Sequence, residues 1–140
     1  ILASEDIGNA DPQALQVAVA AAQAVERVGM PESQIILSQA VTYMACAPKS
    51  NSAVNAIFDA MASVKNTETT VPVHLQDAHY GGHEKLGKGI GYKYAHDYPG
   101  HYVKQQYLPS EIQNERFYEP GELGYEKNIR EYLQKTKWRN

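Results

Sequence analysis

Apolar residues recur with the period of an amphipathic helix through the alanine-rich first half of the chain. Asp11 before Pro12 is a typical helix start, because a carboxylate accepts backbone N–H groups and proline fits the first helical position. The pattern predicts a helix from about Pro12 to Val28 that ends at Gly29. Its apolar residues fall on two faces, Leu15, Val19 and Ala22 on one and Val17, Ala21, Val25 and Val28 on the other. Two apolar faces favour a central helix, with one face in the core and the other against a neighbour.

Two further helices are predicted before residue 66. One restarts at Pro31 and Glu32 and ends before Pro48, since helical geometry is disfavoured at the residue that precedes a proline. Ser50 is expected to cap the other. Its apolar residues follow the i, i+3, i+4, i+7 spacing and predict the clearest buried face of the chain; they are Val54, Ile57, Phe58, Met61 and Val64.

The character of the sequence changes after a polar linker at residues 66–70. Glycine, proline and tyrosine replace the alanine periodicity, and all five histidines and nine of the ten tyrosines lie in the second half of the chain. A short helix is predicted from Val73 to His79. Residues 81–100 contain six glycines and predict a long, irregular and largely ordered loop.

The chain is predicted to end in a helix from about Leu123 to Lys137. Tyr125, Ile129, Tyr132 and Leu133 would share one face, with the charged residues elsewhere. The predicted fold class is therefore mainly α, in a single domain. Its expected parts are a helical core at about 1–66, a loop-rich extension at about 67–122 and a C-terminal helix at about 123–137.

Bulk properties narrow the classes of function. The formal net charge is −3, with 3 Lys or Arg against 7 Asp or Glu in residues 1–70 and 10 against 9 in residues 71–140. This balance argues against a basic nucleic-acid-binding surface that covers the whole domain.

The single cysteine, Cys46, lies in an apolar stretch, so we expect it to pack in the core of a protein from a reducing compartment. With no membrane-spanning run and no signal peptide, the expected location is the cytoplasm. A start at Ile1 in an apolar helical stretch is expected of a piece of a longer protein, and equally of a processed N-terminus.

Residues 82–89 have the spacing of a phosphate-binding loop up to Lys88. Gly89 takes the place of the Ser or Thr that such a loop needs to hold Mg²⁺. The expected strand before the loop and helix after it are also missing from the pattern. Nucleotide binding at this segment is therefore disfavoured, and no cofactor is predicted for this chain.

Histidines and acidic residues offer candidate metal or polar sites. His79 and His83 are four residues apart, but a helix that presents both would have to cross two glycines, and His96 and His101 lie in the irregular segment. Hydrogen bonds to loop backbone are the favoured interpretation, and no metal site or hydrolytic triad is predicted. The acidic run at residues 4–6 is expected to bond a helix end or to lie in solvent, with a contact to a neighbouring domain as the alternative.

Tyrosines and lysines alternate between Tyr92 and Lys104. Such a stretch is compatible with a loop pinned by buried rings, with a protein interface, or with stacking on single-stranded nucleic acid. The sequence leaves these three interpretations open. If the chain contacts DNA or a partner, the candidate residues are Lys88, Lys93, Tyr94, Lys104, Arg130 and Lys137.

Several multi-residue motifs, in order, span almost the entire chain. They are 4–12 (SEDIGNADP), 47–53 (APKSNSA), 71–75 (VPVHL), 77–80 (DAHY), 86–94 (LGKGIGYKY), 96–99 (HDYP), 105–109 (QQYLP) and 117–120 (FYEP). Together they resemble the C-terminal region of the RarA/MgsA family of AAA+ ATPases, the replication-associated recombination proteins. That family is similar to the Werner-helicase-interacting ATPases and to clamp-loader subunits.

The resemblance implies a helical domain related to the clamp-loader collar that holds subunits together as a homotetramer. It also implies that ATP and Mg²⁺ belong to an N-terminal module absent here, so this chain itself would catalyse nothing. The full-length protein is implied to bind DNA ends or forks and single-strand-binding protein near the nucleoid. A membrane partner is not implied.

Overall fold

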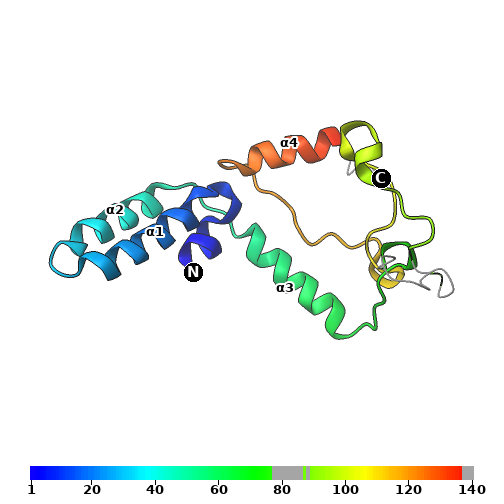
Figure 1. Ribbon diagram of the computed structural model, residues 1–140, viewed down its shortest axis with the longest axis horizontal. Helices are drawn as coiled ribbons and strands as arrows, with labels where there is room; N and C mark the ends of the chain where they lie inside the picture. Colours follow the sequence, from blue (N-terminus) through cyan, green and yellow to red (C-terminus); the bar gives the residue numbers. More distant parts are fainter. Residues whose placement is uncertain (77–86, 88, 137–140) are drawn as a thin grey trace. The chain divides into compact units, whose positions relative to one another are not determined.

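The structure, a computed structural model, describes residues 1–76, 87 and 89–136 of the chain (Figure 1). Within those residues it is mainly helical and contains no strand, which confirms the predicted fold class. The chain divides into two compact units, one formed by residues 1–59 and 117–140 and the other by residues 60–116. The division of a single domain into core, extension and final helix stays a prediction.

Two helices, α1 (Gln13–Val28) and α2 (Ser33–Cys46), pack side by side as an antiparallel hairpin in the first unit (Figure 1). The start of α1 is as predicted, since Asp11 Oδ1 accepts a hydrogen bond from the Gln13 N–H at 3.0 Å. Asp11 Oδ2 accepts a second one, from the Tyr43 hydroxyl of α2 at 2.6 Å. This hydrogen bond, together with burial and the Asp11 charge, raises the pKa of Tyr43. One carboxylate therefore caps α1 and ties it to α2.

Only one of the two predicted faces of α1 is covered. Ala14 is fully buried against Ala3 and Ile7, which lie in a π-helical turn at Ala3–Ile7, and Ala18 packs on the same cluster. Leu15 and Val19, on the other face, are exposed. Within the described residues α1 is thus a two-faced helix with one face unused, and the prediction of a central helix is wrong. The small residues explain the close packing on one side, because alanines let helix backbones approach each other.

The third helix, α3 (Ser52–Lys65), begins where the sequence predicts. The Ser50 hydroxyl accepts a hydrogen bond from the Ser52 N–H at 3.2 Å, so Ser50 caps the helix. The predicted burial of its apolar stripe is wrong: described residues leave most of it exposed, and the partly covered side carries alanines instead. The exposed members of the stripe are Ile57, Phe58, Met61 and Val64.

Cys46 is exposed, so the prediction that it packs in the core is wrong. It is the last residue of α2 and lies about 120° or more around the helix from Ser33 and Ala40, which are buried, given about 100° per residue. The number of apolar residues around Cys46 in the sequence does not indicate on which side of the helix it lies.

The last helix, α4 (Glu126–Thr136), starts three residues later than predicted. Gly124, with φ +56°, adopts a left-handed conformation that cannot continue a right-handed helix, so Leu123 and Tyr125 lie outside α4 and are exposed. The Tyr125 N–H donates to the Ala10 carbonyl at 2.7 Å. Backbone contact, not the tyrosine ring, thus joins the start of α4 to the N-terminal turns.

The second unit contains the end of α3 and a series of single-turn helices. These are Val73–Leu75, Ala95–Asp97, Pro99–His101 and Ser110–Ile112. The helix predicted from Val73 to His79 is a single turn in its described part, and its remainder lies outside the described residues. Val103 and Ile112 are buried, and His74 Nε2 lies 2.7 Å from the Gln106 carbonyl oxygen. In its described residues, 87 and 89–100, the irregular segment forms only single-turn helices and turns, and its order stays a prediction.

Candidate assembly surface and the carboxylate that anchors it

A buried carboxylate lies where α3 and α4 begin. Glu126, the first residue of α4, is 0% exposed, although the sequence pattern placed the charges of this helix outward. Its Oε1 accepts hydrogen bonds from the Ser52 hydroxyl and from the Tyr118 hydroxyl, the latter at 2.9 Å. Its Oε2 accepts one from the Gly121 N–H at 2.8 Å. Every donor comes from the same unit, so the carboxylate joins the start of α3, the segment before α4 and α4 itself.

These donors set the ionisation of the carboxyl group. Burial by itself would raise the pKa of Glu126, but hydrogen bonds from Ser50, Ser52, the Gly121 N–H and Tyr118 outweigh it and hold the pKa below its ordinary value. Tyr118 shows the opposite effect. Its burial and its bond to Glu126 raise its pKa, although a bond from the Asn9 amide at 3.3 Å counteracts them. The cluster therefore holds an ionised carboxylate beside neutral hydroxyl groups.

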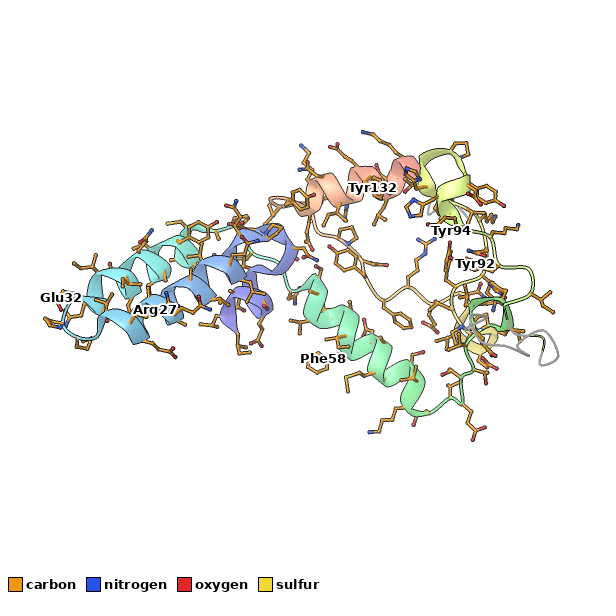
Figure 2. All side chains as sticks on the ribbon, in the orientation of Figure 1. Arg27, Glu32, Phe58, Tyr92, Tyr94 and Tyr132 are labelled. Atoms are coloured by element: carbon orange, nitrogen blue, oxygen red, sulfur yellow. The ribbon has the colours of Figure 1, made fainter. Side chains whose placement is uncertain are left out.

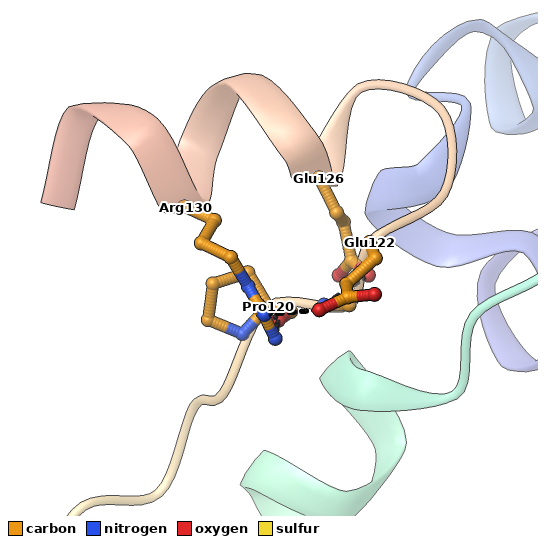
Figure 3. Close-up of polar contacts among 5 residues, drawn as sticks. Pro120, Glu122, Glu126 and Arg130 are labelled. Atoms are coloured by element: carbon orange, nitrogen blue, oxygen red, sulfur yellow. Dashed lines mark hydrogen bonds and ion pairs between the residues drawn. The ribbon is translucent and has the colours of Figure 1, made fainter. Parts of the chain in front are cut away.

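Arg130, one turn further along α4, contacts residues 120–122, the segment that precedes this helix (Figure 3). Its Nη2 donates to the Pro120 carbonyl at 2.8 Å, and its Nη1 pairs with Glu122 Oε1 at 2.7 Å. Glu126 and Arg130 thus both point from α4 toward residues 120–122. Arg130 is a candidate DNA contact by sequence, and that role stays a prediction beside this structural one.

Several large apolar side chains of the first unit are exposed to solvent. Ile35 of α2 is 74% exposed and Phe58 of α3 is 64% exposed, and Figure 2 shows Phe58 projecting from its helix. Exposed apolar residues also line the outer face of α1. The remaining members of this set are Leu15, Val19, Leu37, Val41 and Ile57. The helices α1 and α2 pack against each other, and large exposed apolar patches on soluble monomers mark interaction sites.

The tyrosine- and lysine-rich segment lies in the second unit, where two candidate residues come together. The Gln105 side chain bonds both backbone groups of Lys93, accepting from its N–H at 3.3 Å and donating to its carbonyl at 3.0 Å. Lys104, next to Gln105, and Lys93 are both exposed, as is Tyr94. The structure therefore places Lys93, Tyr94 and Lys104 in one neighbourhood.

Other candidate residues fall elsewhere. Lys88 and Lys137 lie outside the described residues, as do His79, His83 and most of the segment that resembles a phosphate-binding loop. Among the described residues no three His, Cys, Asp or Glu side chains gather closely enough to hold a metal ion. In that same part of the chain, no helix has the length and apolar character to cross a membrane. The acidic run at residues 4–6 is exposed, and the Asp6 carbonyl accepts a hydrogen bond from the Ser50 N–H at 2.8 Å.

The buried cluster around Glu126 was not predicted from the sequence. Its signal was present, because Glu126, Ile129, Arg130 and Leu133 follow the i, i+3, i+4, i+7 spacing of one helix face. The predicted helix began at Leu123 and had Tyr125 on its apolar face, so Glu126 was expected to face solvent. The donors of the cluster lie far apart in sequence, so no local pattern could have assembled them.

Comparison with known proteins identifies the family of this chain. Residues 1–137 match the family described as MgsA AAA+ ATPase C terminal. An uncharacterized AAA domain-containing protein of Mycobacterium tuberculosis is 51% identical over 130 residues, covering 92% of this chain and 29% of that protein. Replication-associated recombination protein A of Bacillus subtilis is 47% identical over 125 residues, covering 89% and 30%. ATPase WRNIP1 of Dictyostelium discoideum is 42% identical over 120 residues, covering 84% and 14%.

A mainly helical chain that matches these proteins over nearly all of its residues is of the class of AAA+ ATPase C-terminal domains. The chain belongs to the MgsA AAA+ ATPase C-terminal family, which confirms the resemblance seen in its motifs. It spans less than a third of the length of these relatives.

Proposed function

We propose that this chain is the assembly domain of a AAA+ ATPase of DNA replication and recombination, and that it joins copies of the protein into a homotetramer. The ATPase module, with its ATP and Mg²⁺, belongs in this proposal to the part of the relatives that the chain does not cover. The expected location is the cytoplasm, at the nucleoid. The single observation that carries the proposal is the exposed apolar surface of α1, α2 and α3.

A second copy of the chain is the occupant that best fits this surface. On α1 and α2 these residues lie on helices that already pack against each other through other faces, so their exposed side chains are not needed for the core of the first unit. Lys65 is the only cation of α3 and Asp59 its only anion, so the stripe between Val54 and Val64 carries no charge pattern that selects a different partner. Copies of one surface can bury each other around a symmetry axis, and an area of well over about 1,000 Å² is then expected.

Assembly also fits the chemistry of the parent class. Nucleoside triphosphate hydrolysis in related enzymes is often completed by an arginine supplied from a second polypeptide. A domain that keeps neighbouring ATPase modules in register supports that chemistry with no catalytic residue of its own. The buried Glu126 cluster contributes here by fixing the start of α3, which carries the stripe.

Phe58→Lys is expected to break the assembly. Light scattering across a concentration series should give four chains for the unaltered protein, and the variant should raise the dissociation constant by at least about 30-fold, as for the loss of a central interface residue. Asp59→Lys is the control, because Asp59 is exposed and lies about 100° around α3 from Phe58 and about 160° from Ile57 and Met61, given about 100° per residue. An unaltered chain that stays monomeric at tens of micromolar overturns the proposal.

DNA binding by the same chain is a second candidate function. It is favoured by one observation, the joint exposure of Lys93 and Lys104 beside Tyr94. A labelled DNA fork is expected to bind at low salt and to lose affinity as salt rises, since contacts to phosphates release counterions. The absence of any mobility shift at low salt would remove this candidate.

A further inference from the structure

Three aromatic side chains contact one another in the second unit and form an aromatic cluster. The ring centroids of Tyr94 and His96 lie 5.0 Å apart with the ring planes tilted by 47°, and those of His96 and His101 lie 4.8 Å apart with a tilt of 53°. All three residues are exposed, with Tyr94 at 53%. Figure 2 shows Tyr94 beside Tyr92, which is exposed as well. The cluster therefore presents aromatic rings to solvent.

Specific hydrogen bonds hold the backbone next to the aromatic cluster. The Gln105 side chain bonds both the N–H and the carbonyl of Lys93, and its Nε2 also donates to the Tyr107 hydroxyl at 3.1 Å. His101 has φ +53°, and no other residue with a positive φ in the described part of the chain carries a side chain. A non-glycine residue in this region costs free energy and persists where its surroundings enforce it. The strained backbone places the His101 ring against His96.

The charge next to the rings is positive. From residue 89 to residue 107 the chain contains Lys93 and Lys104 and one carboxylate, Asp97. Because Gln105 joins the Lys93 backbone to the segment that carries Lys104, two lysines from separate parts of the chain lie in the neighbourhood of Tyr94. Exposed rings beside cations are what unpaired bases and their phosphates require, since every base has a π-face and every nucleotide a negative charge.

We infer that the exposed, contacting side chains of Tyr94, His96 and His101, with Lys93 and Lys104 nearby, form a binding surface for single-stranded nucleic acid. The inference rests on the second candidate function above and names its site and substrate class. Paired bases within a duplex cannot reach exposed rings, so the surface selects single strands. The basic C-terminal residues are not needed for it.

Fluorescence anisotropy with a labelled oligothymidylate and a duplex of mixed sequence tests this. The unaltered chain should bind the single strand more tightly than the duplex. Tyr94→Ala should weaken single-strand binding by about 5- to 100-fold, the range for losing one stacked base. Tyr94→Phe keeps the ring and should bind within about twofold of the unaltered chain. Tyr132→Ala, which removes an exposed tyrosine from α4, serves as the matched control and should have no effect.

The outcomes separate this inference from the proposals it accompanies. Circular dichroism should show the same helix content in all variants, because none of the altered residues is buried. Fork binding that survives unchanged in Tyr94→Ala would leave the DNA-binding function standing and overturn this site. Equal weakening in Tyr94→Phe and Tyr94→Ala would also overturn it, as would capture of a protein partner by this surface with no binding to oligothymidylate.

Discussion

Gly124→Ala is expected to lower the free energy of unfolding of the chain by about 3 kcal/mol, combining left-handed strain with overpacking. A Cβ at this position would overlap the carbonyl oxygen of Ala10 and come within 2.7 Å of Pro48 Cγ. Ala10 is also the acceptor for the Tyr125 N–H, so the contact that joins α4 to the N-terminal turns would be pushed apart. Urea unfolding followed by circular dichroism measures the loss.

Gly100→Ala is the control for this prediction. Gly100 is also left-handed, with φ +70°, but an added Cβ there would meet no atom within 4 Å. Its substitution should cost only the strain, about 1 kcal/mol. Equal losses for the two variants would show that strain alone, and not the close approach of Ala10 and Pro48, makes glycine necessary at position 124.

Helix positions were predictable where local chemistry decides them. Asp11 caps α1, Ser50 caps α3, and Gly29 ends α1, each with the hydrogen bond or backbone angle that its residue type favours. Proline at position 48 likewise ends α2 near the predicted residue. These signals depend on a few neighbouring residues, so they can be recognised from sequence without knowledge of the tertiary structure.

Burial was predictable only in part, because it depends on what lies opposite each face. The stripe on α3 has ideal helical spacing, yet Phe58 is exposed, whereas Ala14 is fully buried. Periodicity identifies an apolar face but not whether it packs within the chain or against another molecule. Exposure of the most regular stripe is the expected result for a domain whose core is completed by assembly.

The candidate surface in the second unit was predictable in its residues but not in its geometry. The alternation of Lys93 and Tyr94 with histidines was visible in the sequence. The hydrogen bonds from Gln105, twelve residues away, and the ring contact of His101 with His96 depend on the tertiary structure, and His101 has a positive φ. A positive φ is uncommon for any residue other than glycine, so the sequence did not indicate this turn.

Glu126→Ala is expected to cost about 3–5 kcal/mol of unfolding free energy, the range for breaking a buried charged hydrogen-bond network. The loss follows because the substitution leaves the Gly121 N–H and the hydroxyls of Ser52 and Tyr118 without their acceptor. Glu126→Gln should cost less, about 1–3 kcal/mol. The hydroxyls of Ser52 and Tyr118 can rotate to accept from the new amide, whereas the Gly121 N–H must still find the amide oxygen.

The pH dependence of stability distinguishes an ionised Glu126 from a neutral one. Because the folded-state pKa of Glu126 is lowered, the stability that its charge contributes is fully present above about pH 4.3, the ordinary pKa of glutamate. It is lost as the pH falls through the lower folded-state value. The difference in unfolding free energy between the unaltered chain and Glu126→Gln should therefore shrink below about pH 4.3. Glu122→Gln is the matched control: its side chain is 77% exposed in its pair with Arg130, so it should change stability by less than about 1 kcal/mol. A difference for Glu126→Gln that stays constant from neutral pH into acid would mean that this carboxyl group has the same pKa in the folded and unfolded chain, which contradicts the lowered value.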